Sequence, residues 1–362
     1  MNSKQRFKRL MGKQLPDRVL RDYWAVPEIN QRLSKHFGLK TQEDLLNKLD
    51  IDFRYIEGPT YIGTPLAKHG DGSEDDLWGV PRKTMITGEG EFRGSYKAVT
   101  RYPLADCKTV ADVLKYDKWP SPDWYDYSPI AEQCERCGDR VAMFMGDRLN
   151  RVAQLKPAMY LRGVDQILID MRRKSNEIFI AIRDKIRDFY NEYLRRILKA
   201  AKRKIDVIVT GDDFGTQNGL FCQVEVWRKN LMPGFKDYIQ ICKAAGVPVM
   251  HHTCGSIRLL IPSFIECGLD ILNPLQPLVY DMDHAKIKEE FGHKLAFHGG
   301  ISLQGPLRFG TPDEVKAEVK QRVADLGKNG GYIICTAHNI QADTRTENIV
   351  ALFKAYDEYS KY

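Results

Sequence analysis

The chain has 362 residues, of which 43% are hydrophobic and 28% are charged, and its formal net charge is +7. This balance is typical of a globular protein with a substantial core. No window approaches the roughly 18 uninterrupted apolar residues of a membrane helix, and no interleaving of basic and aromatic residues indicates nucleic-acid binding.

The first 18 residues, MNSKQRFKRLMGKQLPDR, are basic and lack the apolar stretch of a secretory signal. We therefore expect a cytoplasmic protein with no membrane or nucleic-acid partner. The positive charge weakly favours an anionic small-molecule substrate. The expected oligomeric state is a monomer or a homodimer.

Residues 1–140 have no regular pattern, and the segment 58–85 within them is rich in loop-forming residues. We interpret this part as an N-terminal elaboration of loops and helices that caps or lines a larger domain. Cys134 and Cys137 form a CxxC motif, but a zinc knuckle requires a second such pair, which the sequence lacks. The motif is therefore interpreted as a helix end with two incidental cysteines.

Strands and helices alternate through residues 141–362, and a long amphipathic helix is expected within this part at about 175–203. The strands are apolar on both faces, which indicates a parallel sheet covered by helices. No GxGxxG follows a strand, which disfavours a doubly wound sheet. The expected fold is one α/β domain over 1–362, a distorted (β/α)8 TIM barrel. The strands are expected at 205–213, 247–254, 269–276, 294–302 and 331–339.

Two of the intervening helices carry a start signal. Thr311 and Glu314 match a capping box at the start of the helix expected within 310–331. Thr344 and Glu347 match the same pattern for the helix at 344–359.

Polar residues follow the strands where each one ends. In a barrel of this kind the site lies at the carboxyl ends of the strands, so these side chains are expected on one rim. They are Asp212, Asp213, His252, Cys254, Asn273, Gln276, His298, Cys335, His338 and Asn339.

The segment VPVMHHTCGS (247–256) carries the clearest chemical signal. Residues two apart on a strand point to the same side, so His252 and Cys254 are expected to project together and His251 to point outward. Imidazole and thiolate both suit Zn²⁺. The alternative is a buried strand whose tip is merely polar.

A catalytic zinc needs a third protein ligand and an open position. The last strand offers His338 or Cys335, which are three residues apart and so are expected on opposite faces of a regular strand. Only one of the two should face the barrel axis, and His252, Cys254 and that residue would supply the three ligands.

The chain resembles the uroporphyrinogen decarboxylase superfamily over most of its length. The segments that carry this resemblance are PDRVLRDYWAVPE (16–28), DDLWGVP (75–81), YPLADCKTVADV (102–113), GDDFGTQNG (211–219), HHTCGSIRLLIPSFIECGLDILNPLQP (251–277), LAFHGGISLQ (295–304) and AHNIQADTRTENIVALF (337–353).

The resemblance implies a distorted (β/α)8 barrel and one of two activities. One branch decarboxylates uroporphyrinogen without a cofactor. The other contains zinc-dependent methyltransferases that move methyl groups between a corrinoid (cobalamin) and a thiol or related acceptor, and some relatives demethylate methoxylated substrates. The decarboxylases carry an Arg-Gln-Ala-Gly-Arg motif, whereas this chain keeps only Arg21 in that region. His252 and Cys254 match the methyltransferase motif, whose further cysteine aligns with His338, where the decarboxylases also have a histidine. The resemblance therefore implies His338 as the third ligand, alternatively Cys335, or neither.

We therefore expect a zinc-dependent methyltransferase whose corrinoid arrives on a partner protein or free, because the chain has no DxHxxG motif. A cofactor-free decarboxylase is the alternative, and a non-catalytic ligand-binding barrel is the second. The candidate catalytic residues are Asp213, Asp212 and His338. Asp213 is expected to act as acid or base or as a fourth metal ligand, although it suits a helix cap equally well. The candidate substrate-binding residues are Trp78, Asn273, Gln276, His298, Gln304, Asn339 and Gln341.

Overall fold

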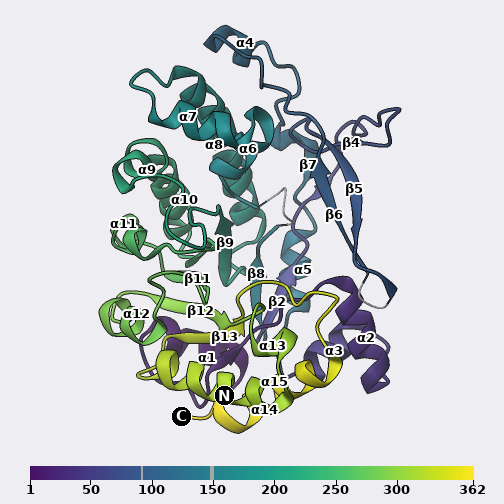
Figure 1. Ribbon diagram of the computed structural model, residues 1–362, viewed down its shortest axis with the longest axis vertical. Coiled ribbons are helices and arrows are strands. Elements are labelled where there is room, and N and C mark those ends of the chain that lie inside the picture. The colour runs from purple at the N-terminus through teal and green to yellow at the C-terminus, as the bar shows by residue number, and fades with distance from the viewer. Residues whose placement is uncertain (91–92, 147–150) are drawn as a thin grey trace.

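The computed structural model describes residues 1–90, 93–146 and 151–362. Eight parallel strands of this described part form a nearly closed barrel (Figure 1), in the order β1-β13-β12-β11-β10-β9-β8-β2. At the remaining gap, the amide of Asp52 donates to the carbonyl oxygen of Arg21 at 3.0 Å. The strands are β1 (Leu20–Arg21), β2 (Phe53–Ile56), β8 (Val141–Phe144), β9 (Val207–Gly211), β10 (Val249–His252), β11 (Ile271–Leu275), β12 (Ala296–Ile301) and β13 (Tyr332–Thr336). The expected barrel fold is confirmed.

The barrel interior is filled by alternate residues of the strands, as the two-residue period of a strand requires. A separate buried cluster of apolar side chains occupies it, whereas the intervening residues pack under the helices. Its members from the regular repeats include Val207, Val209, Met250, Ile271, Ala296 and Ile333. Both faces of the sheet are therefore apolar, which explains the continuous apolar runs in the sequence.

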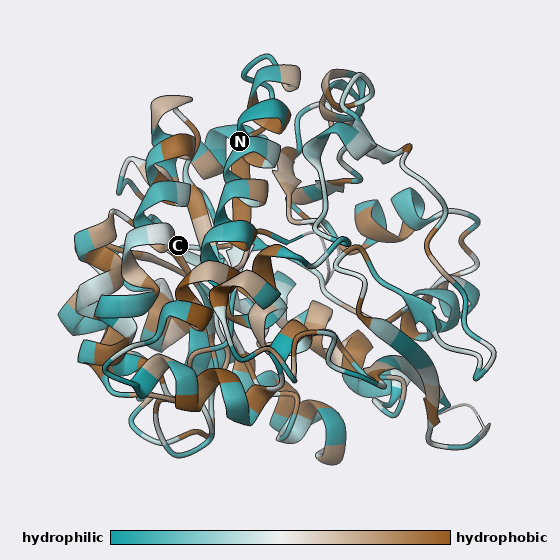
Figure 2. Cartoon of the chain, turned by 90° about the horizontal axis from the view of Figure 1, so that it is seen from above, coloured by the Kyte–Doolittle hydropathy of each residue, from teal (hydrophilic) through white to brown (hydrophobic). Residues whose placement is uncertain are grey.

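Helices surround the barrel, and brown and teal residues alternate along them, as expected of helices with one buried face (Figure 2). The long helix expected at 175–203 is α8 (Glu177–Ala200). The other helices of the regular half are α6 (Leu155–Arg162), α7 (Val164–Arg172), α9 (Val224–Asn230), α10 (Met232–Ala244), α11 (Ile261–Cys267), α12 (His284–Phe291), α13 (Pro306–Phe309), α14 (Pro312–Arg322) and α15 (Thr346–Tyr359). None of the helices built from the described residues has the length and apolar character needed to cross a membrane.

The N-terminal 140 residues do more than the sequence predicted, because they supply β1 and β2 of the barrel itself. These strands have two and four residues, too few to produce a recognisable pattern. The same part contains α1 (Ser3–Met11), α2 (Pro27–Phe37), α3 (Gln42–Lys48), α4 (Val110–Leu114), α5 (Ile130–Arg136), the strand pair β3 (Thr60–Tyr61) and β7 (Tyr125–Asp126), and the antiparallel sheet β4 (Glu74–Asp75), β5 (Pro81–Thr87) and β6 (Gly94–Val99). Figure 1 places β5 and β6 on the side of the molecule away from α9–α11.

The predicted helix and cysteine features have mixed outcomes. Thr311 and Glu314 form the expected capping box of α14. The box predicted at Thr344 is wrong: Thr344 is buried, and α15 begins at Thr346 without a side-chain cap. Cys134 lies in α5 and Cys137 ends it, as expected, and both are free thiols.

Candidate active site

Three potential metal ligands meet at the carboxyl ends of β9 and β10. Asp213 follows β9, His252 ends β10, and Cys254 lies two residues further on. One ligand atom from each lies within 4.8 Å of the other two. The Nε2 atom of His252 is 3.4 Å from the Cys254 Sγ and 3.8 Å from a carboxylate oxygen of Asp213. We call these residues the Asp-His-Cys trio.

Each member of the trio is held by a neighbour. The Asp213 carboxylate accepts hydrogen bonds from the Cys254 amide at 3.0 Å and from the Lys156 ammonium at 2.7 Å. The Nδ1 atom of His252 lies 2.6 Å from Oδ1 of Asn273. Asp213 caps no helix among the described residues, since α9 begins only at Val224, so its contacts favour the chemical interpretation over the cap.

The surroundings of the trio set its protonation state. Burial lowers the pKa of His252 well below its usual value, and the nearby Arg151 charge lowers it further. Burial alone would raise the pKa of Asp213, but the positive charge of Lys156 keeps it well below its usual range. Burial, followed by the Asp213 charge, raises the pKa of the Cys254 thiol to about 12. At neutral pH the imidazole and the carboxylate are therefore in their metal-binding forms, and the thiol must lose its proton on binding.

The trio fits Zn²⁺. It offers one imidazole nitrogen, one sulfur and one carboxylate oxygen, which are the three ligand types that zinc takes in proteins. The two nearest cavities open onto these atoms, so a further position is accessible to a small molecule.

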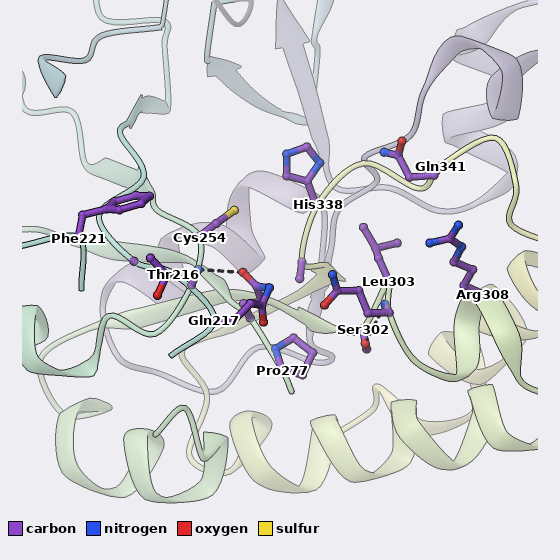
Figure 3. A pocket seen from close by; sticks show the side chains of 15 residues that line it. Thr216, Gln217, Phe221, Cys254, Pro277, Ser302, Leu303, Arg308, His338 and Gln341 are labelled. Atoms are coloured by element: carbon purple, nitrogen blue, oxygen red, sulfur yellow. Dashed lines mark hydrogen bonds between the residues drawn. The ribbon is translucent and has the colours of Figure 1, made fainter. Parts of the chain in front are cut away.

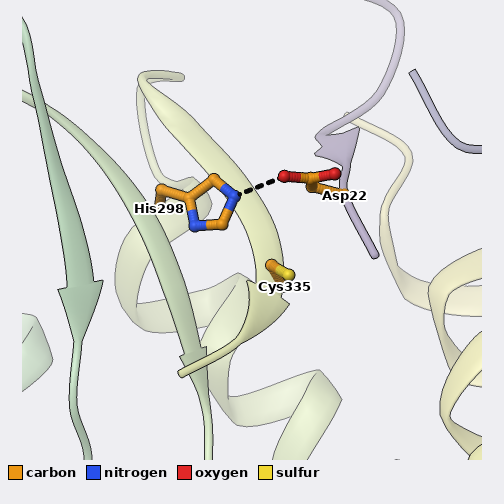
Figure 4. A group of neighbouring side chains, drawn as sticks. All are labelled: Asp22, His298 and Cys335. Carbon is orange, nitrogen blue, oxygen red and sulfur yellow. Dashed lines mark hydrogen bonds and ion pairs between the residues drawn. The ribbon is translucent and has the colours of Figure 1, made fainter. Parts of the chain in front are cut away.

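The sequence favoured His338 or Cys335 as the third ligand, and the structure brings Asp213 to that position instead. Cys335 is fully buried and belongs to a different group, with Asp22 and His298 (Figure 4), so this alternative is wrong. His338 is exposed, and its ring centre lies 5.8 Å from that of His252. It remains a candidate for a fourth contact.

Two cavities adjoin the trio. The first, of about 570 Å³, opens onto Cys254 and is shown in Figure 3. The second, of about 400 Å³, opens onto Asp213 and His252. His338 lines both, so it stands where the two approaches to the trio meet. We call them the Cys254 cavity and the Asp213 cavity.

The predicted substrate-binding residues divide between cavity and core. Gln276, Gln304 and Gln341 line the Cys254 cavity, and Asn339 lines the Asp213 cavity. Gln276 also accepts a hydrogen bond from the Gly255 amide at 2.8 Å, which fixes its orientation.

Asn273 and His298 were expected to contact substrate, and this is wrong, since both are fully buried inside the barrel. Trp78 is wrong as well, because it is buried against Phe189 and Tyr190 of α8. A tryptophan in a loop segment gives no signal that separates packing from substrate contact.

Asp212 is a structural residue, not a catalytic one. Its buried carboxylate accepts hydrogen bonds from the backbone amides of Gln154, Leu155 and Lys156 at 2.6–2.9 Å. It therefore caps the first turn of α6 from outside the helix. Both residues follow β9, which ends at Gly211, and their bonds show their directions: Asp212 turns to the start of α6, whereas Asp213 turns to Cys254 and Lys156 at the mouth.

Three charged or aromatic residues that line the Asp213 cavity were missed. Lys156 and Arg151 bring positive charge to it, and Trp24 covers one side. Lys156 lies in the first turn of α6 and Trp24 follows the short strand β1, so neither had a regular strand end to mark it.

His251 points outward, as expected. Its Nδ1 atom lies 2.8 Å from the Thr210 hydroxyl, and its ring packs against Phe214, Phe235 and Phe264.

Acidification is expected to destabilise the fold partly through His251, because burial lowers the pKa of its imidazole to about 3. In the unfolded chain the His251 imidazole takes up a proton below about pH 6.5, whereas in the folded protein it stays neutral. Its contribution to the free energy of unfolding is therefore complete above that pH and is lost as pH falls towards the folded pKa. At about pH 4.5 the loss is roughly 2–3 kcal/mol. Urea unfolding at neutral pH and at about pH 4.5 measures this loss of stability. An equal loss in a His251→Phe variant would contradict the role of His251.

The comparisons with known proteins identify the family. The model for uroporphyrinogen decarboxylase (URO-D) matches residues 153–359, and the chain belongs to this family. The uroporphyrinogen decarboxylase of Actinobacillus pleuropneumoniae serotype 5b is 27% identical over 188 residues, which are 51% of this chain and 49% of that protein. The Actinobacillus succinogenes decarboxylase is 31% identical over 115 residues, which are 32% and 30% of the two chains. The chain thus matches about half the length of these curated relatives, or less.

A solved structure extends the likeness to the whole chain. A methyltransferase from Methanosarcina mazei superposes with a TM-score of 0.65 and covers 99% of each chain at 17% identity. At this identity the superposition establishes the shared barrel fold.

Proposed function

We propose that this protein is a zinc-dependent methyltransferase that moves a methyl group between a small methylated substrate or thiol and a corrinoid. The observation that carries the proposal is the Asp-His-Cys trio, with three zinc-type ligand atoms within 4.8 Å of one another beside two cavities. The methyltransferase of the same fold supports this choice within the family.

In the proposed site, His252, Cys254 and Asp213 hold the metal. Zn²⁺ bound there supplies a Lewis acid that lowers the pKa of a thiol or polarises an ether oxygen. Lys156 keeps Asp213 ionised, and His338 faces both cavities, where it can exchange a proton with substrate.

The cavities suit small ligands better than a whole corrinoid. Their volumes of about 570 and 400 Å³ fall within the range for ordinary small molecules. The small substrate therefore occupies one cavity, and the corrinoid presents its methyl position at the barrel mouth, carried by a partner protein or free. The glutamine side chains of the Cys254 cavity, together with Arg308, offer hydrogen bonds to a small polar ligand.

The curated relatives favour a second candidate, a cofactor-free decarboxylase. A substrate with several carboxylates requires fixed guanidinium groups in the cavity. Arg21, kept from the expected motif, is buried and donates to Asp357, to the Tyr356 carbonyl oxygen and to Ser360 of the C-terminal segment. Its guanidinium is thus committed to holding the fold. Among the described lining residues, each cavity has one arginine, Arg308 paired with Asp343 in the Cys254 cavity and Arg151 in the Asp213 cavity. This is fewer guanidinium groups than a substrate with several carboxylates requires, which favours the methyltransferase.

Removing the metal tests the proposal. In the presence of the zinc-bound protein, methylcobalamin with a small thiol such as 2-mercaptoethanol should give the methyl thioether and cob(I)alamin, seen under anaerobic conditions as loss of the methylcobalamin absorption bands. Chelation should stop this loss, and added Zn²⁺ should restore it, because the thiol would lose its activating ion. Equal turnover after chelation contradicts the zinc mechanism. Loss of carbon dioxide from uroporphyrinogen by the metal-free protein favours the decarboxylase, and binding without turnover favours a ligand-binding barrel.

A further inference from the structure

A line of buried polar side chains crosses the barrel interior beneath the trio. Nδ1 of His252 lies 2.6 Å from Oδ1 of Asn273, and Nδ2 of Asn273 lies 2.5 Å from Nδ1 of His298. Nε2 of His298 lies 2.9 Å from the Asp22 carboxylate. These residues come from β10, β11, β12 and the end of β1, and each is at most 3% exposed.

We propose that Asn273, His298 and Asp22 are positioning residues that fix the tautomer of His252, so that Nε2 offers its lone pair to the metal. This inference rests on the proposed zinc site. It assigns a role to side chains that touch neither cavity.

The direction of the hydrogen bonds is set at the Asp22 end. The Asp22 carboxylate accepts from the Tyr55 hydroxyl at 2.5 Å and from the Tyr23 amide at 2.8 Å. The Tyr55 oxygen in turn accepts from the Trp24 indole N–H at 2.5 Å, so its own proton points to Asp22. Since a carboxylate only accepts, the partner nitrogen of His298 must donate.

The remaining assignments follow one from another. The NH₂ group of Asn273 faces Nδ1 of His298, and because an NH₂ group only donates, Nδ1 accepts while Nε2 donates to Asp22. The Asn273 oxygen then faces His252 and accepts from Nδ1–H. The Nε2 lone pair of His252 is left facing Cys254 and Asp213, which is the form that binds a metal.

A second metal site at Asp22, His298 and Cys335 is the competing interpretation, because their ligand atoms also lie close together (Figure 4). The hydrogen bonds argue against it. Both ring nitrogens of His298 already have partners, and Asp22 accepts from three donors. Burial, followed by the Asp22 charge, raises the pKa of the Cys335 thiol well above its usual value, which favours a protonated thiol over a metal-binding thiolate.

The first test is made on the full-length, zinc-free protein. Long-range proton–nitrogen NMR of ¹⁵N-histidine protein, with His252 assigned by its loss in His252→Gln, reports which ring nitrogen carries the proton. We expect protonation at Nδ1. Protonation at Nε2 would overturn the inference.

The second test compares two substitutions at His298, which does not touch the metal ligands. His298→Gln keeps a donor towards Asp22 and an acceptor towards Asn273, whereas His298→Leu keeps neither. We expect His298→Leu to lose the tautomer preference and about 10- to 100-fold in zinc affinity by chelator competition, as for other outer partners of metal ligands. His298→Gln should retain most of both. Unchanged tautomer and affinity in a folded His298→Leu would overturn the inference.

Cys335→Ser is the matched control, because it alters the neighbouring group outside the line of hydrogen bonds. We expect the same zinc stoichiometry and affinity as in the wild type, and loss of one of two bound ions would instead establish the second metal site. If His298→Leu does not fold, the wild-type tautomer decides. If Nδ1 of His252 carries the proton but the protein transfers no methyl group, the proposed function is wrong and the positioning role still holds.

Discussion

Replacing His252 and Cys254 together by alanine is expected to abolish both zinc binding and methyl transfer. The change removes the nitrogen and sulfur ligands and leaves Asp213 as the only member of the trio. Loss of a side chain that only hydrogen-bonds to a metal ligand typically lowers the metal affinity by about 10- to 100-fold. Loss of two direct ligands should lower the affinity by more than that. Zinc content after dialysis and methylcobalamin turnover measure the two effects.

A matched control for this double variant replaces the exposed His36 and the half-buried Cys222, which lie outside the trio. We expect this control to keep its zinc and its activity. The cooperative unfolding transition of both variants should remain, since neither change removes a large apolar side chain. Methyl transfer that survives the loss of His252 and Cys254 would show that the site is wrong.

Asp213→Asn is expected to weaken zinc binding far more than His338→Ala. The asparagine oxygen is a neutral and poorer ligand, and the Lys156 ammonium, left without its carboxylate, would repel the ion. We expect a loss of at least about 10-fold in affinity, or about 1.4 kcal/mol, for Asp213→Asn. For His338→Ala, we expect less than about 3-fold, or roughly 0.7 kcal/mol.

The Lys156 contribution can be separated. Adding Lys156→Met to Asp213→Asn removes the unpaired charge and should recover part of the affinity. Chelator competition on all four proteins measures the effects. A larger loss for His338→Ala than for Asp213→Asn would make His338 the third ligand, as the sequence favoured.

The regular half of the barrel could be read from sequence because each buried strand has a long apolar run with a polar end. β9 to β13 all show it. The short strands β1 and β2 do not, and their identity depends on pairing with β13 and β8 across the barrel. Such pairing is a property of the closed sheet, which a local pattern does not contain.

Within the site, the sequence predicted the His252–Cys254 pair because the two lie on one strand and share its period. The identity of the third ligand depends on which strand ends are neighbours in the barrel and on how deep each side chain lies below the mouth. Cys335 and His298 were predicted at strand ends, but they lie within β13 and β12 and are fully buried in the barrel interior, below the mouth. Asp212 and Asp213 are the same residue type, and the sequence does not show which side chain points to the mouth. The hydrogen bonds from the Gln154 and Lys156 amides, at the start of α6, hold the Asp212 side chain away from it.

X-ray absorption at the zinc edge of the purified, active protein tests the central claim most directly. The proposed site predicts one zinc per chain, with a single sulfur at about 2.3 Å and nitrogen or oxygen neighbours at about 2.0–2.2 Å. The sulfur signal should vanish in Cys254→Ser. Active protein that contains no metal, or a zinc with two sulfur neighbours, would contradict the Asp-His-Cys trio as the metal site.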